Sequence, residues 1–159
     1  MKVIAGGQTG VDRAALDAAM EFGLPHGGSC PLGRRAEDGV IPQRYRLDET
    51  TSADYAARTE RNVLDSDATL VLCRGMPKGG TSLTISLAER HRKPIIVADP
   101  DDLTAAERIA EWLQEHEFSI LNVAGPRESQ CPGIASAAQR VLRDVFERLG
   151  PPPVRDDAR

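Results

Sequence analysis

Two glycine-rich segments of this chain contain residue types that bind anions through the backbone. The first is Ala5-Gly6-Gly7-Gln8-Thr9-Gly10-Val11-Asp12, which follows the apolar run Lys2-Val3-Ile4 and precedes a helical pattern. Gly7 and Gly10 hold the second and third glycine positions of a G-x-G-x-x-G turn, and Ala5 holds the first. Such a turn lets the backbone approach an anion, and the start of the following helix directs free N–H groups at it. The segment therefore predicts a ligand site, with a purely structural connection as the alternative.

The second glycine-rich segment, residues 74–81, also lies between a predicted strand and a predicted helix. Two helix N-termini that converge on one crevice would each offer N–H donors and about half a positive charge. Arg34, Arg35 and Lys78 can add full charges, which suits a phosphate or a similar oxyanion. The predicted ligand-binding residues are Gly6, Gly7, Gln8, Thr9, Gly10, Asp12, Arg34, Arg35, Lys78, Gly79, Gly80, Thr81, Ser82 and Thr84.

Two common nucleotide motifs do not fit these segments. A Walker motif needs a lysine after its last glycine, but Gly10 is followed by Val11. A dinucleotide site places an acid about 20 residues after the glycine turn, whereas this chain has Cys30 and Pro31 there, with basic residues just beyond. This composition favours a phosphate over a ribose diol.

Three carboxylates near the turns are the candidate catalytic acids: Asp12, Glu37 and Asp38. Asp12 falls in the first turn of the predicted helix, where it could simply stabilise the helix dipole. The chain has no C-x-x-C or H-x-x-x-H spacing, so we predict no metal site. The three cysteines are interpreted as small buried apolar residues.

The elements that must position these residues alternate between strand and helix. Hydrophobic patterns predict strands at residues 2–5, 26–30, 68–73, 94–98 and 118–123, and helices at 11–22, 53–65, 81–91, from 104 onwards and 132–149. This alternation indicates one α/β domain of residues 1–150, with a parallel sheet covered by helices on both faces. We expect the strand order 3-2-1-4-5 or a close relative, with the two glycine turns on adjacent strands. Residues 151–159 are expected to form a flexible tail.

Some local features carry predictions of their own. Residues 31–51 are expected to form an ordered functional loop anchored by Val40, Ile41, Tyr45 and Leu47, with a solvated surface loop as the alternative. Thr51 or Ser52 is predicted to cap the second helix, and Thr104 with Glu107 to form a capping box. In the second helix, Tyr55, Ala56, Val63 and Leu64 should form the apolar face, and a polar line of Arg58, Asn62 and Asp65 could border the site.

Composition limits the classes of partner. The net charge of −4 argues against general nucleic-acid binding, and no apolar run reaches the roughly 20 residues of a membrane span. No signal peptide is visible, and three widely spaced cysteines indicate a reducing compartment. We therefore expect a cytoplasmic protein, and apolar helices around Val63 and near the C-terminus suggest a homo-oligomer.

Several blocks of the chain resemble the family named "putative molybdenum carrier protein", a circularly permuted YpsA-type branch of the SLOG superfamily. The blocks that carry the resemblance are residues 6–13, 30–39, 58–63, 65–69, 79–81 and 122–129. The resemblance implies a Rossmann-like fold and binding of molybdenum cofactor (molybdopterin) or a related nucleotide-like ligand. The wider superfamily also contains lysine-decarboxylase-like nucleotide phosphoribohydrolases with the motif P-G-G-x-G-T-x-x-E. This chain lacks the motif's glutamate, because the first glutamate after Thr81 is Glu89.

Three functions remain open from the sequence. The first is a carrier that holds a phosphorylated pterin or a nucleotide between residues 6–10 and 79–81. The second is a nucleotide-processing enzyme that cleaves an N-glycosidic bond, with Asp12, Glu37 or Asp38 as acid–base. The third is a regulatory protein that senses a nucleotide.

Overall fold

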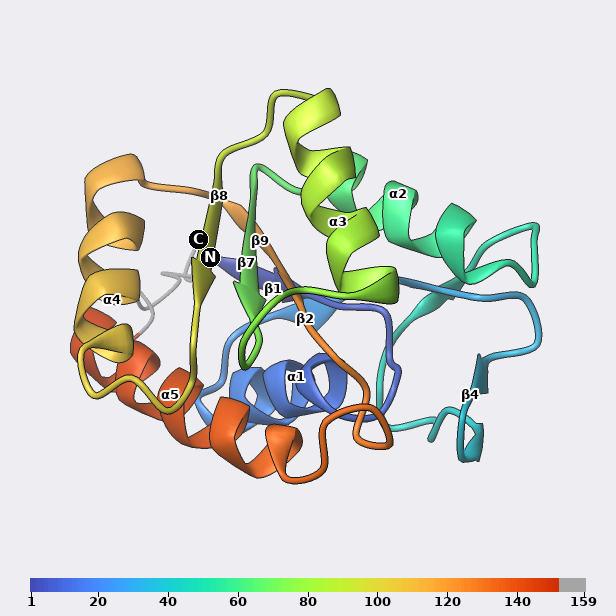
Figure 1. Ribbon diagram of the computed structural model, residues 1–159, viewed down its shortest axis with the longest axis horizontal. Coiled ribbons are helices and arrows are strands. Elements are labelled where there is room, and N and C mark those ends of the chain that lie inside the picture. The colour runs from blue at the N-terminus through green and yellow to red at the C-terminus, as the bar shows by residue number, and fades with distance from the viewer. Residues whose placement is uncertain (152–159) are drawn as a thin grey trace, which may run out of the picture.

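A computed structural model describes residues 1–151 of the chain. Its centre is a five-stranded parallel sheet of β1 (Lys2–Ile4), β2 (His26–Gly27), β7 (Ala68–Leu72), β8 (Ile95–Ala98) and β9 (Ile120–Ala124) (Figure 1). The helices are α1 (Val11–Glu21), α2 (Tyr55–Asp65), α3 (Gly79–Arg90), α4 (Ala105–His116) and α5 (Ile134–Leu149). The predicted α/β class and helix positions are confirmed. Of the predicted tail, residues 152–159 lie outside the described part.

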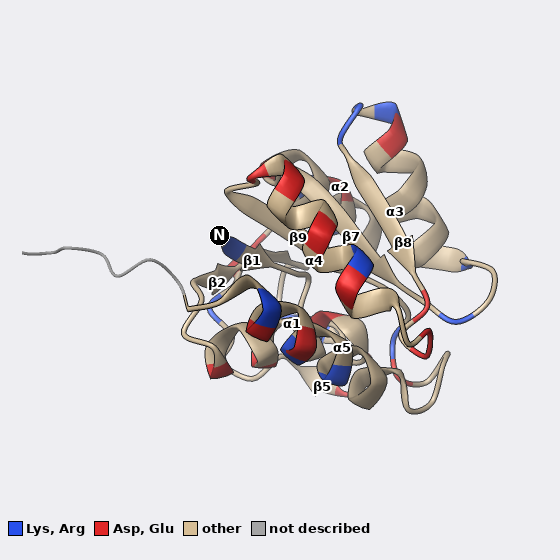
Figure 2. Ribbon diagram, turned by 90° about the vertical axis from the view of Figure 1, so that its left-hand side faces the viewer, with Lys and Arg blue, Asp and Glu red and all other residues tan. Residues whose placement is uncertain are grey.

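The helices form two layers on either side of the sheet. α1, α4 and α5 pack together on one face, and α2 and α3 pack together on the other (Figures 1 and 2). Both layers bury small and branched aliphatic side chains, because the chain has few aromatic residues. Within the described residues, no helix is long and apolar enough to span a membrane.

The strand order differs from the prediction. The sheet runs β2-β1-β9-β7-β8, so the last strand of the chain lies in the centre, between β1 and β7. Its buried Leu121 and Val123 pack on the same face as α1, α4 and α5, and on the opposite face Asn122 Nδ2 donates to Thr69 Oγ1 of β7 at 3.3 Å. The two glycine turns therefore follow strands that are not adjacent. Because all five strands are parallel, both turns still lie at the same edge of the sheet, as predicted.

The long connection between β2 and α2 is ordered and contains short pairings. β3 (Ser29–Cys30) pairs with β6 (Asp48–Glu49), and β4 (Arg35–Ala36) forms a hairpin with β5 (Gly39–Val40). Ile41 and Tyr45 are buried, as predicted, and the Tyr45 hydroxyl donates to Asp17 Oδ1 at 2.8 Å. The prediction that Val40 anchors the loop is wrong, because Val40 lies in β5 with 69% of its surface exposed.

Two predicted helix caps are also wrong. Asp54 caps α2, and its Oδ1 accepts the Ala56 N–H at 3.0 Å. At α4 the Thr104 hydroxyl donates to Asp102 Oδ1, and its side chain accepts no capping hydrogen bond, so the capping box does not form. The predicted apolar face of α2 is largely exposed, with only Val63 among its fully buried residues.

The three cysteines are free thiols. Cys30 and Cys73 are buried and Cys131 is partly buried. Burial raises the pKa of the Cys30 and Cys73 thiols. Both therefore behave as the apolar residues that the sequence predicts.

Candidate functional site

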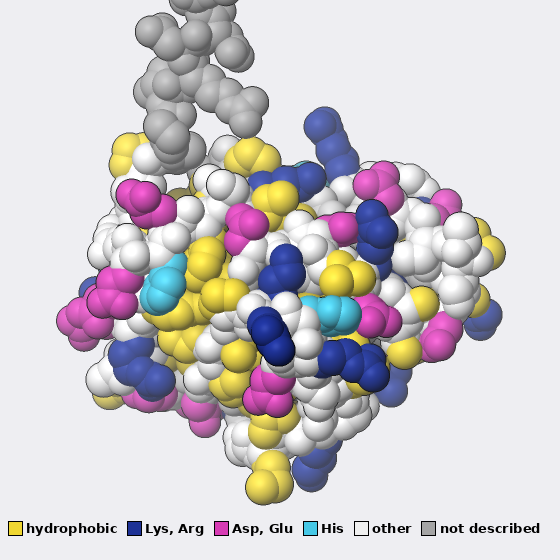
Figure 3. Space-filling view, turned by 90° about the horizontal axis from the view of Figure 1, so that it is seen from above, with side chains coloured by type: hydrophobic (Ala, Val, Ile, Leu, Met, Phe, Trp, Pro, Cys, Tyr) yellow, Lys and Arg dark blue, Asp and Glu magenta, His cyan; other side chains and the backbone are white. Residues whose placement is uncertain are grey.

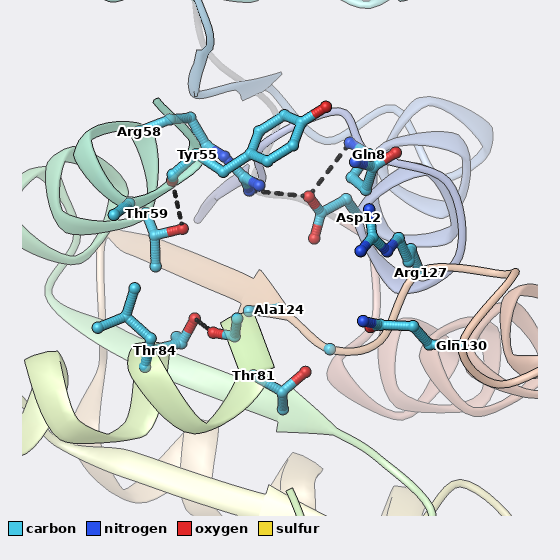
Figure 4. Close-up of a pocket in the computed structure, with 14 residues that line it drawn as sticks. Gln8, Asp12, Tyr55, Arg58, Thr59, Thr81, Thr84, Ala124, Arg127 and Gln130 are labelled. Atoms are coloured by element: carbon cyan, nitrogen blue, oxygen red, sulfur yellow. Dashed lines mark hydrogen bonds and ion pairs between the residues drawn. The ribbon is translucent and has the colours of Figure 1, made fainter. Parts of the chain in front are cut away.

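A cavity of about 170 Å³, here called the site cavity, opens at the carboxyl edge of the sheet (Figure 4). Four segments line it: the first glycine turn with α1, the start of α2, the start of α3, and the chain that follows β9. Its lining residues are Gln8, Asp12, Tyr55, Ala56, Arg58, Thr59, Gly80, Thr81, Leu83, Thr84, Ala124, Gly125, Arg127 and Gln130. Both glycine-rich segments therefore face one cavity, with β9 between their strands.

A buried ion pair forms one wall of the site cavity. Arg58 Nη1 lies 3.1 Å from Asp12 Oδ2, and their side chains are 14% and 5% exposed. The Gln8 N–H donates to the same oxygen at 3.2 Å, and the other carboxylate oxygen points into the cavity (Figure 4). Burial raises the pKa of Asp12, while Arg58 and the N–H groups of Gln8 and Gly6 oppose that shift.

Glycines of the first turn make room for the protein's own chain. A Cβ at Gly6 would overlap the Arg58 guanidinium, and a Cβ at Gly10 would overlap the Pro126 carbonyl oxygen. The Val11 N–H donates to that oxygen at 3.2 Å, and the Thr9 N–H donates to Gln8 Oε1 at 3.0 Å. Several N–H donors at the start of α1 therefore already have acceptors inside the protein.

The second glycine turn is open. Lys78 precedes the first residue of α3 and its side chain makes no capping hydrogen bond. A Cβ at Gly80 would meet no atom within 4 Å, and Gly79 and Gly80 are both exposed. Thr81 is 4% exposed and lies at the cavity wall (Figure 4). The start of α3 is therefore accessible to a ligand, in contrast to the start of α1.

Two of the candidate acids lie outside the site cavity and have other partners. The Glu37 carboxylate accepts hydrogen bonds from the Thr9 hydroxyl and from the Ser129 hydroxyl and N–H. Burial raises the pKa of Glu37, but those hydrogen bonds outweigh burial and the net shift is downward. Glu37 thus joins the first glycine turn to the segment after β9.

Asp38 forms a two-point ion pair with Arg13, at 2.5 and 2.7 Å, and this pairing lowers the pKa of Asp38. Arg13 Nε also donates to Gly7 O at 3.0 Å. The pair therefore fastens the hairpin of β4 and β5 to the first turn. Asp12 is the one candidate acid among the residues that line the site cavity.

Several predicted ligand contacts lie away from this cavity. The Arg34 guanidinium donates to the carbonyls of Ile41, Pro42, Tyr45 and Leu47. Arg35 and Ser82 are exposed and do not line the cavity. Lys78 lines a neighbouring cavity of about 270 Å³ that also contains Cys73. Of the predicted set, the site cavity contains Gln8, Asp12, Gly80, Thr81 and Thr84. Whether these residues contact a ligand stays a prediction.

The sequence did not single out as site residues the other lining residues of α2, which are Tyr55, Ala56 and Thr59, or those of the chain after β9. Arg58 belongs to the polar line that was expected to border the site, and it does line the cavity. Arg127 and Gln130 were not predicted as site residues, although residues 122–129 form one of the family-like blocks. Arg127 is 37% exposed, and its Nε lies 3.6 Å from Glu37 Oε2.

Comparison with known proteins identifies the family. A model of the circularly permuted YpsA family of the SLOG superfamily matches residues 3–146. The chain belongs to this family. A search of curated proteins found no match.

A crystal structure of a similar protein supports the assignment. It is described as a "Putative molybdenum carrier protein" from Syntrophus aciditrophicus SB, and it is 46% identical to this chain. The match covers 91% of this chain and 93% of the relative, with a TM-score of 0.86. The fold of this SLOG protein is therefore the fold of that relative.

Within residues 1–151, no group of three or more His, Cys, Asp and Glu could hold a metal. The site cavity instead combines hydrogen-bond donors, two guanidinium groups, a carboxylate and a tyrosine ring. These groups suit an organic anion better than a metal ion.

Proposed function

We propose that this protein is a carrier that binds a small phosphorylated ligand, either a molybdenum-bearing pterin or a nucleotide-like molecule, in the site cavity. The observation that carries the proposal is the chemistry of the walls. An uncapped helix start and a guanidinium can bind an anion. An aromatic ring and a carboxylate can bind a heterocycle. The description of the similar crystal structure as a molybdenum carrier supports molybdenum as the cargo.

The phosphate would lie at the start of α3. Free N–H groups and the helix dipole favour an anion there, and Gly80 leaves space for it. Arg127 from the segment after β9 adds a full positive charge, and its ion pair with Glu37 is long at 3.6 Å. In this arrangement Arg127, which is distant in sequence from both turns, supplies the positive charge that a lysine supplies in a Walker motif.

The heterocycle would lie against Tyr55. This side chain is 39% exposed and borders the site cavity, which leaves a ring face available for stacking (Figure 4). The Asp12 carboxylate can accept a hydrogen bond from a ring N–H or amino group. Pterins and purines both carry such groups, so both ligand classes fit.

The arrangement of the acids favours a carrier over an N-glycosidic hydrolase. Glu37 and Asp38 have lowered pKa values and are bound by neighbours outside the cavity. Asp12 is paired with Arg58, and the second turn lacks the glutamate of the phosphoribohydrolase motif. A molybdenum atom carried here in molybdopterin would be held through the pterin and the phosphate of its cofactor.

The test combines detection of a ligand with titration. Native mass spectrometry of the purified protein should reveal a co-purified pterin or nucleotide. In calorimetric titrations with molybdopterin, molybdate, GMP, AMP and inorganic phosphate, Arg127→Ala should weaken the tightest ligand about 10- to 100-fold, since a charge-assisted hydrogen bond contributes roughly 1.5–3 kcal/mol. Arg35→Ala removes the same charge outside the cavity and should bind as the wild type does.

Two results would contradict the proposal. Equal affinities for the Arg127→Ala and Arg35→Ala proteins would exclude the site cavity as the anion site. Hydrolysis of a nucleoside monophosphate by the wild type that disappears in Asp12→Asn would support the enzyme instead.

A further inference from the structure

A second cavity adjoins the site cavity where α3 begins. This neighbouring cavity of about 270 Å³ contains Lys78, directly before α3, and Pro126 from the chain after β9. The first turn of α3 lines the site cavity instead, and Gln130 lines both cavities. Gly79 lies between the two in sequence, and a Cβ at this exposed residue would meet only Gln130 Nε2, at 3.9 Å. The chain between the cavities is therefore open backbone, which a long ligand can cross.

Hydrogen-bond donors without an acceptor gather at this junction. Within residues 1–151, the N–H groups of Gly79 and Gly80 donate to no acceptor, whereas the Thr81 N–H donates to Lys78 O at 3.1 Å. The Thr81 hydroxyl has no partner among the same residues, although Thr81 is only 4% exposed, and it faces the site cavity (Figure 4). The Gln130 amide also extends into this cavity without a partner in the described part of the chain (Figure 4). Donors therefore continue from the site cavity towards the neighbouring cavity.

Two basic side chains line the neighbouring cavity, and they differ in their partners. Arg74 Nε and Nη2 pair with Asp101 at 2.6 and 3.2 Å, and Arg74 Nη1 donates to Pro132 O at 3.4 Å, so this guanidinium is held in place and its charge is balanced. Lys78 is exposed, and no acidic side chain of residues 1–151 lies within ion-pair distance of it. Lys78 can therefore bind a second anionic group, as Arg127 can bind the first.

The other walls of the neighbouring cavity are mostly apolar. Met76, Pro77, Pro126 and the buried Cys73 form them, and Met76 is 81% exposed. At about 270 Å³ against about 170 Å³, this cavity is also larger than the site cavity. A phosphate gains nothing from apolar walls, whereas an aromatic ring is stabilised by contact with proline faces and a flexible methionine. The neighbouring cavity therefore suits a second ring as well as a second phosphate.

We propose that the ligand is a dinucleotide, in which a diphosphate joins two halves that each carry a ring. The first half occupies the site cavity, with its ring against Tyr55 and its phosphate at the start of α3. The second phosphate lies beside Lys78, and the second ring lies against Met76 in the neighbouring cavity. A diphosphate diester carries a negative charge on each phosphate, and Arg127 and Lys78 balance one each. This inference rests on the proposed function, because it adds a second half to the ligand of the same site.

Calorimetric titrations of the full chain with matched ligands test this inference. The ligands are AMP, ADP and diadenosine diphosphate, and the corresponding guanosine series. At least one dinucleotide should bind about 10-fold or more tightly than its mononucleotide, because it adds a charge-assisted hydrogen bond at Lys78 and a ring contact at Met76. The nucleoside diphosphate of that series should have an intermediate affinity, since it adds the second phosphate without the second ring.

Variants of the neighbouring cavity should remove this advantage of the dinucleotide. Lys78→Ala should lower the ratio of dinucleotide to mononucleotide affinity about 10-fold. Met76→Glu should lower the same ratio, because it replaces an apolar contact by a negative charge. Both side chains are exposed, so both variants should fold.

Arg90→Ala is the matched control, because it removes a positive charge from the last turn of the same helix. That end of α3 lies on the opposite side of the molecule from both cavities, where Figure 3 shows several basic side chains on the surface. The affinity ratio should be unchanged in this variant.

The outcomes separate this inference from the carrier proposal. Dinucleotides that bind no more tightly than their mononucleotides would overturn the inference, and so would a Lys78→Ala protein that keeps the full advantage of the dinucleotide. In both cases the carrier proposal stands if Arg127→Ala still weakens mononucleotide binding. An Arg127→Ala protein that binds every ligand as the wild type does would instead overturn the carrier proposal, and this inference with it.

Discussion

The two glycine-rich turns follow parallel strands and begin helices, but their backbones have opposite surroundings. Around the first turn, Arg58 and Pro126 occupy the space where Gly6 and Gly10 lack a side chain. Around the second, the space beside Gly80 is open. The same order of strand, glycine-rich turn and helix can therefore leave space for the protein's own atoms or for a ligand. In this molecule the backbone of the first turn packs against its own chain, whereas the backbone of the second turn is open.

The largest difference in stability between the two turns should appear when their glycines are replaced by alanine. Gly10 has φ near 82° and a Cβ would overlap Pro126, so Gly10→Ala should cost about 3 kcal/mol of unfolding free energy or more. Gly23 has φ near 67° with no atom within 4 Å, so Gly23→Ala should cost about 1 kcal/mol. Gly80→Ala should leave stability unchanged or raise it slightly. Urea unfolding measures all three, and a Gly10→Ala protein as stable as Gly23→Ala would show that the first turn is not tightly filled.

The next effect concerns the ion pair behind the first turn. Arg58→Ala leaves the Asp12 carboxylate buried without its partner, which should cost about 2 kcal/mol, somewhat less than for a fully buried pair because the cavity admits water. Arg61→Ala removes an exposed ion pair with Asp65 on the same helix and should change stability by less than about 0.5 kcal/mol. Adding Asp12→Asn to Arg58→Ala should recover part of the loss. Equal losses of unfolding free energy for Arg58→Ala and Arg61→Ala would mean that the buried ion pair stabilises the protein no more than the exposed one.

A smaller effect should appear in the pH dependence of the first turn. The folded pKa of Glu37 is lowered, so its hydrogen bonds stabilise the protein above the unfolded pKa of about 4.3, and this stability is lost as the pH falls through the folded value. Glu37→Gln should therefore flatten the loss of stability between about pH 5 and pH 3. The contribution of Asp12 to stability has the opposite pH dependence, because a raised folded pKa favours the folded state at lower pH. Thermal unfolding across this range checks the difference, and parallel curves for wild type and Glu37→Gln would contradict it.

The strands and helices could be predicted from sequence because their signals are local. The apolar run of residues 68–72 and the periodic residues of α5 define their elements without reference to the rest of the chain. The strand order could not be predicted in this way, because the insertion of β9 between β1 and β7 depends on contacts between residues about 50 to 120 positions apart. The composition of β9 itself carries no signal for a central position.

The strand order also explains which of the predicted site residues line the cavity. Because β9 is central, the segment that follows it enters the cavity and contributes Arg127 and Gln130. Because β2 is at the edge of the sheet, no residue of the segment that follows it lines the cavity, and Arg34 binds the carbonyls of its own loop. The cavity is therefore lined by Arg127, and not by Arg34 or Arg35.

The most direct test of the comparison is a ligand titration of two valine variants of α3, one at the open turn and one away from it. Gly80→Val places a side chain where the ligand's anionic group should meet the backbone of α3, whereas Ser86→Val makes a similar change on the exposed face of the same helix. Calorimetry with the tightest phosphate-bearing ligand should show at least a roughly 10-fold loss of affinity for Gly80→Val, equivalent to about 1.4 kcal/mol, and no loss for Ser86→Val. If both folded variants bind as the wild type does, the open turn is not the anion site and the account is wrong.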